Sequence, residues 1–169
     1  MPNHPGQAFT VTVDKKKIMV ATDNFSGFVS TLFIGSEQQE DLANGIIQAI
    51  TPFKAASLAT VRVDQAPAFK ALMLKPANLK EAGIELEPGE CKNKNALALV
   101  DRKMQELETE IKKAASSRNT LNIKVLAKAT TAVNEKVRHQ GLSAKEIIFS
   151  RDQTTVENIV WRKVGTTET

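Results

Sequence analysis

The residues of this chain that could do chemistry are acidic, and Asp64 is the best placed of them. It follows the alternating run 59–63, which predicts a β-strand, and it precedes Pro67, which favours the start of a helix. A carboxylate at the end of a strand lies at the sheet edge where α/β proteins commonly hold their sites. An aspartate just before a helix can equally act as a helix cap, so Asp64 has two candidate roles.

Other kinds of catalytic or metal chemistry have few residues to draw on. The chain has one cysteine, Cys91, and two histidines, His4 and His139. A disulfide within the chain is therefore excluded, as is a zinc site built from paired cysteines. Catalysis would have to rely on carboxylates, and a site made of carboxylates alone prefers a hard cation such as Mg²⁺ or Mn²⁺.

Lysines gather in short clusters along a chain whose formal net charge is +4. Lys92 and Lys94 alternate with asparagines, and the segment 15–17 is three consecutive lysines. Each cluster is either an ordinary solvated face or a contact surface for phosphate groups. The charge fits an anionic partner without identifying one.

The composition is that of a single globular domain. The chain has 169 residues, of which 41% are hydrophobic and 25% charged, enough for one sizeable core. No apolar run approaches the roughly 20 residues that span a bilayer. The first residues lack the basic and apolar regions of a signal peptide. The sequence therefore predicts an intracellular protein, nuclear or cytoplasmic, with no membrane partner.

Hydrophobic periodicity predicts strands followed by alternating helices and strands, and hence an α/β domain with a mixed sheet. Ser36 and Gln39 resemble a capping box at the start of the first helix, which Pro52 ends. We divide the chain into a flexible arm (1–7), a domain (8–150) and a polar tail (151–169). The predicted strands are 8–13, 18–22, 28–34, 59–63 and 84–86, and later helices are predicted over 68–74, 77–82, 96–115, 121–138 and 143–149.

Four segments, in order and over nearly the whole chain, resemble the integrase core of retroviruses and long-terminal-repeat retrotransposons. This resemblance implies a ribonuclease-H-like fold, with a five-stranded mixed sheet flanked by helices. It also implies that two copies of the chain pair as a dimer. The segments are TDNFSGF (22–28), VRVDQAPAFKAL (61–72), NKNALALVDRKMQELETEI (93–111) and GLSAKEIIFSRDQ (141–153).

The same resemblance implies an acidic metal site. Such cores are taken to use carboxylates from strand ends and a helix to hold two metal ions on either side of a phosphate. The segment VDQAPAF matches the family's second acidic motif and implies Asp64 as a ligand. The segment VDRKMQEL matches the third and puts Asp101 where the family has glutamate.

The first acidic position has three candidates. One alignment places Thr12 there, which would mean a lost ligand. Another takes Asp14 as the surviving ligand, shifted by a shorter hairpin, and we prefer it. Asp23 falls in the family's turn segment, where a structural Asx turn is expected. The predicted catalytic residues and metal ligands are thus Asp14, Asp64 and Asp101, and the predicted nucleic-acid contacts are Lys92, Lys94 and Lys103.

These matches predict a retrotransposon integrase core. Its activity would be polynucleotidyl transfer on DNA, covering 3′-end processing and strand transfer, with Mg²⁺ or Mn²⁺ as cofactor. Whether the chain is an enzyme stays open, because Asp101 is one methylene shorter than glutamate and the first ligand is unsettled. The alternative is a catalytically inactive or domesticated descendant that binds nucleic acid or protein.

Overall fold

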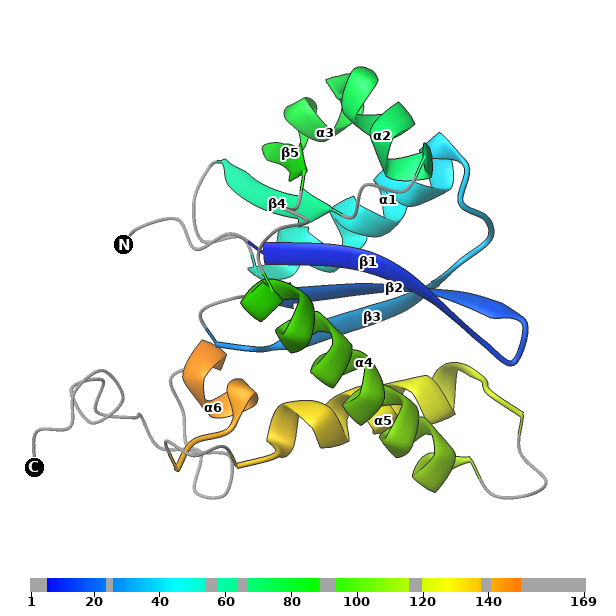
Figure 1. Cartoon of the computed structure of the whole chain (residues 1–169), viewed down its shortest axis with the longest axis vertical. Coiled ribbons are helices and arrows are strands. Elements are labelled where there is room, and N and C mark those ends of the chain that lie inside the picture. The colour runs from blue at the N-terminus through cyan, green and yellow to red at the C-terminus, as the bar shows by residue number, and fades with distance from the viewer. Residues whose placement is uncertain are drawn as a thin grey trace, which may run out of the picture.

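Five strands form one mixed sheet in the order β3-β2-β1-β4-β5 (Figure 1). The computed structural model describes residues 6–23, 26–53, 58–63, 67–88, 94–115, 120–137 and 141–149. The first three strands form an antiparallel meander, and the last two run parallel to β1. The predicted α/β class and five-stranded mixed sheet are confirmed. The strands are β1 (Gly6–Val13), β2 (Lys16–Asp23), β3 (Val29–Ile34), β4 (Ala59–Val63) and β5 (Ile84–Pro88).

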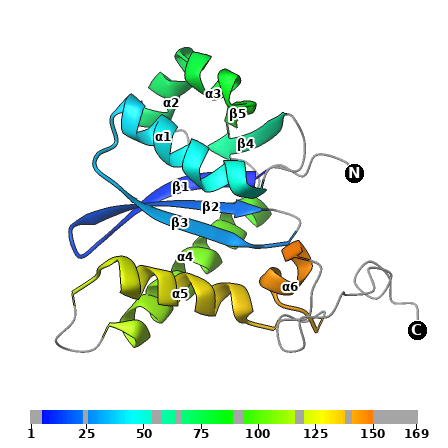
Figure 2. The same ribbon diagram turned by 180° about the vertical axis from the view of Figure 1, so that it is seen from behind.

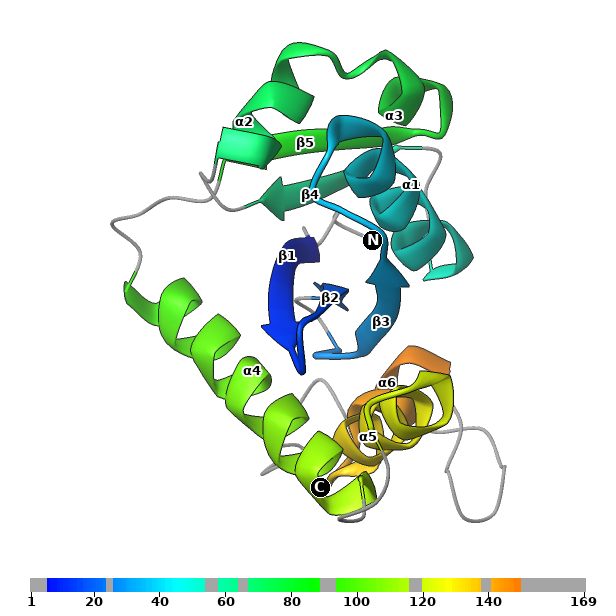
Figure 3. The same cartoon turned by 90° about the vertical axis from the view of Figure 1, so that its right-hand side faces the viewer.

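Helices cover both faces of this sheet (Figures 1 and 3). The first three α-helices pack on one face, and the two longest ones pack on the other. No helix in the described part of the chain is both long and apolar enough to cross a bilayer. The helices are α1 (Gln39–Ile50), the 3-10 turn η1 (Thr51–Phe53), α2 (Pro67–Leu74), α3 (Ala77–Glu81), α4 (Lys94–Ala114), α5 (Ile123–Glu135) and α6 (Ala144–Phe149).

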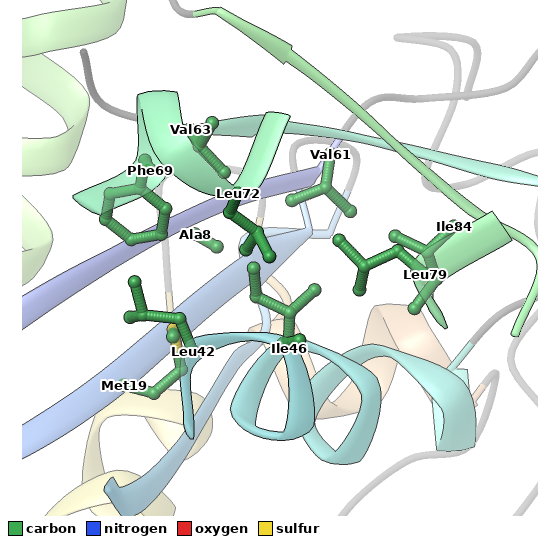
Figure 4. Packing of buried hydrophobic residues seen from close by; sticks show 11 residues of the cluster. Ala8, Met19, Leu42, Ile46, Val61, Val63, Phe69, Leu72, Leu79 and Ile84 are labelled. Carbon is green, nitrogen blue, oxygen red and sulfur yellow. The ribbon is translucent and has the colours of Figure 1, made fainter. Parts of the chain in front are cut away.

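Alternation along the strands gives the sheet two separate cores. Ala8 belongs to the cluster beneath α1, α2 and α3, together with Phe69 (Figure 4). The next residue, Phe9, belongs to the opposite cluster with Leu107 of α4 and Val133 of α5. Successive side chains of a strand point to opposite faces. The sheet is therefore buried on both sides in its centre.

A single buried asparagine fastens α5 to the edge strand β3, which lie side by side in Figure 2. The side chain of Asn134 accepts a hydrogen bond from the Val29 N–H and donates one to the Val29 carbonyl, each at 2.8 Å. A second polar contact, 2.6 Å long, joins the hydroxyls of Thr31 and Thr130. These bonds fix the position of α5 along the sheet.

The capping box predicted at Ser36 is wrong, and a real one lies elsewhere. Helix α1 has Gln38 as its N-cap, without a side-chain cap bond. Ser36 instead donates to Asp41 through its hydroxyl. The reciprocal pair is found before α6, where the Ser143 N–H donates to Glu146 at 2.9 Å and the Glu146 N–H donates to the Ser143 hydroxyl at 3.1 Å. This arrangement satisfies two backbone donors at the start of a short helix.

Glu110 of α4 is a nearly buried carboxylate between two lysines. Its Oε1 lies 3.3 Å from Nζ of Lys136 and 3.4 Å from Nζ of Lys113. Burial by itself raises the pKa of Glu110, but the two ammonium groups outweigh it and hold the pKa below the ordinary value of 4.5. The charged form of Glu110 is thus favoured in the folded state.

Glu110→Gln should make the free energy of unfolding less dependent on pH at acidic pH. A carboxyl group whose pKa is lowered on folding contributes stability above its unfolded pKa, and this stability is lost as the pH falls through its folded pKa. We therefore expect the free energy of unfolding of the native protein to decline below pH 4.5, the ordinary value, and Glu110→Gln to lack part of that decline. Urea unfolding across the pH range measures both proteins. Glu108→Gln, at an exposed position of the same helix, is the charge-matched control, and an unchanged pH slope in Glu110→Gln would contradict the expectation.

Candidate functional site

The predicted acidic site is centred on the end of β4. Strand β4 ends at Val63, and α2 begins at Pro67. Asp64 and Lys92 lie outside the described residues, so the two candidate roles of Asp64 stay predictions. Strand β4 up to Val63 is described, so the other candidate ligands can be compared with the end of this strand.

The pairing of β1 with β4 identifies the neighbour of this position. The two strands are parallel, and Ala8 of β1 pairs with Val63 of β4. The β1 residue that follows Ala8 is Phe9, whose side chain is 6% exposed and packs in the core with α4 and α5. A buried phenyl ring, and not a carboxylate, therefore follows the β1 residue that pairs with the end of β4.

Asp14 lies at the other end of β1. It is an exposed residue of the β1–β2 hairpin turn, with a φ angle of 49°. It is six residues beyond Ala8, which corresponds to about 20 Å along an extended strand. The two ions of a two-metal site are only about 4 Å apart. The structure therefore does not bring Asp14 to the end of β4. Thr12, four residues beyond Ala8 and also exposed, is about 13 Å away by the same reckoning.

Asp23 has the structural role that the sequence predicts. Its Oδ2 accepts hydrogen bonds from the Ser26 N–H at 2.9 Å and from the Ser26 hydroxyl at 2.7 Å. These bonds close the turn between β2 and β3, in which Gly27 has a φ angle of 75°. Asp23 thus stabilises this turn, as expected, although its backbone hydrogen bond reaches three residues on rather than the two of an Asx turn.

Helix α4 passes over this same turn. A Cβ atom added to Gly27 would lie 3.4 Å from Nζ of Lys103. Asp101 precedes Lys103 by two residues and is exposed. Since Asp23 pairs with Gly6 at the beginning of β1, Asp101 and Lys103 lie toward the end of the sheet opposite to Asp14. Of Lys94, the structure describes only that α4 begins there.

The predicted ligands Asp14 and Asp101 lie toward opposite ends of the sheet. Asp14 is too far from the end of β4 to share an ion with a residue there. Within the described ranges, no three acidic, histidine or cysteine side chains lie close enough together to hold a metal ion. Because Asp64 lies outside the described residues, the donor set Asp14, Asp64 and Asp101 stays a prediction, and Asp14 is the member that the structure places far from the end of β4.

A second feature lies at the hairpin end of the sheet, where an open groove of about 720 Å³ runs between the β1–β2 turn and the start of α5. The three consecutive lysines of the turn were noticed in the sequence as a cluster. Their neighbours Asn122 and Lys124 were not, because they follow the turn by more than 100 residues and only the fold brings them there. Its described lining residues are Lys15, Lys16, Lys17, Phe33, Ile34, Gly35, Asn122, Ile123 and Lys124.

Comparison with known proteins bears on the fold. No protein-family model and no curated protein matches the sequence. Among solved structures, the chain is similar to the catalytic core domain of BIV integrase, with a TM-score of 0.72 and 22% sequence identity. The likeness covers 87% of this chain and 94% of that one. Together with the strand order, it shows that this chain has the ribonuclease-H-like fold of a retroviral integrase catalytic core.

Proposed function

We propose that this domain binds nucleic acid through an integrase-core fold and does not carry out two-metal phosphoryl transfer. The register of β1 against β4 carries the proposal, because buried Phe9, rather than an acidic residue, comes directly after the β1 residue that pairs with Val63. The formal net charge of +4 favours a polyanionic partner. The fold that it shares with an integrase core points to the same class of partner.

The loss of one carboxylate weighs heavily in such chemistry. Two-metal catalysis stabilises the attacking and leaving oxygens only if both ions are held in place. Phe9 offers no oxygen, and its burial in the core ties the ring to its present position. Asp101 adds a second defect, because a side chain one methylene shorter than glutamate displaces its oxygens by about 1 Å, which can cost on the order of 100-fold in rate.

Polynucleotidyl transfer is the second candidate function. It is favoured by the location of Asp101 and Lys103 on α4, toward the end of the sheet where β1 begins. In this version, Asp64 and Asp101 would bind the metal ion, and Lys92, Lys94 and Lys103 would contact the phosphates. A first ligand other than Asp14 would then be required, since Asp14 lies about 20 Å along the strand from Ala8.

Binding of duplex DNA tests the proposed function. We expect the association constant to fall steeply with salt concentration, because lysines release counterions from the phosphates. We expect it to be the same in Mg²⁺ and in EDTA, and the same for Asp64→Asn and Asp101→Asn as for the native chain. Fluorescence anisotropy of a labelled duplex measures it.

Two results would count against the proposal. The absence of binding at low salt would remove nucleic acid as the partner and favour a protein-interaction module instead. Binding that requires Mg²⁺ and is lost in Asp64→Asn would favour a working metal site. Sedimentation velocity on the same samples checks the predicted dimer, which a monomer at high concentration would contradict.

A further inference from the structure

The groove at the hairpin end of the sheet joins two distant parts of the chain. Figures 1 and 2 both show the tip of the β1–β2 hairpin beside the start of α5. Lys16 connects them, because its Nζ donates a hydrogen bond to the Leu121 carbonyl oxygen at 2.5 Å and lies 5.7 Å from the centre of the Phe33 ring. This lysine is engaged within the protein, so its main role is to hold the two walls together.

Two other lysines of the groove are available to a ligand. Lys15 and Lys124 are exposed, one on each wall. Within the described ranges, neither has a carboxylate partner in a salt bridge. Lys17 is only weakly engaged, at 3.8 Å from Glu37 and with 40% of its side chain exposed. A lysine without an ion-pair partner has no carboxylate of the protein that competes with an outside anion, although salt screens its attraction.

Positive charge predominates in the lining of the groove. Four of its described lining residues are lysines and none is acidic. Just outside it, Asp14, Glu37 and Asp41 supply three negative charges against the four lysines, which leaves an excess of positive charge. Lys124 lies in the first turn of α5, whose free N–H groups add to the positive potential. Asn122 already caps that helix by accepting a hydrogen bond from the Val125 N–H at 3.0 Å.

We infer that this groove binds the phosphate backbone of duplex nucleic acid, with Lys15 and Lys124 contacting phosphates from its two walls. The inference rests on the proposed function and names the surface that performs it. A polyanion fits better than a small anion, because the cations are spread over two walls of an open groove of about 720 Å³ rather than converging on one point. Duplex DNA carries closely spaced charges that can meet both walls at once.

This surface is separate from the predicted acidic site. The hairpin tip is about 20 Å along β1 from the residue that pairs with Val63. Binding here would therefore proceed without a metal ion and without Asp64. Lys15 and Lys124 are not among the contacts that the sequence predicts, which are Lys92, Lys94 and Lys103.

The double substitution Lys15→Gln with Lys124→Gln tests the assignment. A plot of the logarithm of the association constant against the logarithm of the salt concentration has a negative slope, and each lost phosphate contact makes it less steep by about 0.9. The slope should therefore become less steep by about 2 in this variant. Near 0.1 M salt the same contacts are worth about 8-fold each, which gives an affinity loss on the order of 60-fold. The matched control is Lys70→Gln with Lys80→Gln, which changes the net charge equally at exposed positions of α2 and α3. The control should keep nearly the native slope. Thermal unfolding verifies that both variants fold.

The outcomes separate this inference from the proposed function. If the native chain binds the duplex and both double variants bind it equally well, the groove assignment is wrong while nucleic-acid binding stands. If the native chain does not bind the duplex at low salt, both the proposed function and the groove assignment are wrong. Displacement of the duplex by polyglutamate at a lower charge concentration than by unlabelled DNA would point to an acidic protein partner and would also overturn the inference.

Discussion

Phe9→Ala should lower the free energy of unfolding by about 4 kcal/mol, which is typical of removing a buried aromatic ring. The ring is 6% exposed and lies in the cluster formed with Leu107, Ile111 and Val133. Its removal would leave a cavity between the sheet and helices α4 and α5. Urea unfolding followed by circular dichroism measures the change. The expected loss is a large share of a typical domain's stability of about 5–15 kcal/mol.

Two variants on the same strand calibrate this result. Phe9→Leu keeps most of the apolar volume and should cost clearly less than Phe9→Ala. Thr12→Ala replaces an exposed residue of β1 and should change stability by less than about 0.5 kcal/mol. If Phe9→Ala were no more destabilising than Thr12→Ala, the ring would not be a core residue, and the argument that β1 lacks a metal ligand would lose its basis.

Asn134→Ala should lower the free energy of unfolding by about 3 kcal/mol. Asn134 is 4% exposed, and it pairs both the N–H and the carbonyl of Val29. Truncating it leaves two backbone groups without partners, and each buried unsatisfied group costs about 1–3 kcal/mol. Because the two bonds join α5 to β3, amide hydrogen exchange in β3 should also accelerate.

Asn134→Asp tests the same contact from the other side. An aspartate can still accept from the Val29 N–H but brings a negative charge to the Val29 carbonyl, so we expect it to be destabilising as well. Thr131→Ala, at an exposed position of the same helix, is the control and should be nearly neutral. Stability close to native in both Asn134 variants would show that these hydrogen bonds do not hold α5 in place.

The parts of the fold that follow from local pattern were predictable. The alternation over residues 8–13 already places Ala8 and Phe9 on opposite faces of a sheet, and the structure has them in two different cores. The structural role of Asp23 in its turn was predictable for the same reason, since its hydrogen-bond partner Ser26 is only three residues away. Local chemistry decides both features.

Contacts between distant segments were not predictable in this way. The sequence places Asn134 only within the predicted helix 121–138, because nothing near it in sequence reveals a partner 105 residues away. The two segments that begin at Ser36 and Ser143 share the same capping pattern, yet only Ser143 forms the reciprocal bonds. Ser36 donates to Asp41, which lies within α1.

The candidate site was the least predictable part, because its residues come from distant segments of the chain. The choice of Asp14 as first ligand depended on where the hairpin falls relative to the end of β4, and strand register is a property of the assembled sheet. The pairing of Ala8 with Val63 sets it. A shorter hairpin was visible in the sequence, but not that Asp14 would stand at the far end of β1.

An assay of strand transfer on a branched DNA substrate in Mg²⁺ and in Mn²⁺ tests the central claim most directly. The native chain and Asp64→Asn are compared at concentrations at which both bind the DNA. An integrase-core fold without a complete acidic site should give no product above the level of Asp64→Asn in either metal. A metal-dependent product that the native chain forms and Asp64→Asn does not would contradict the account.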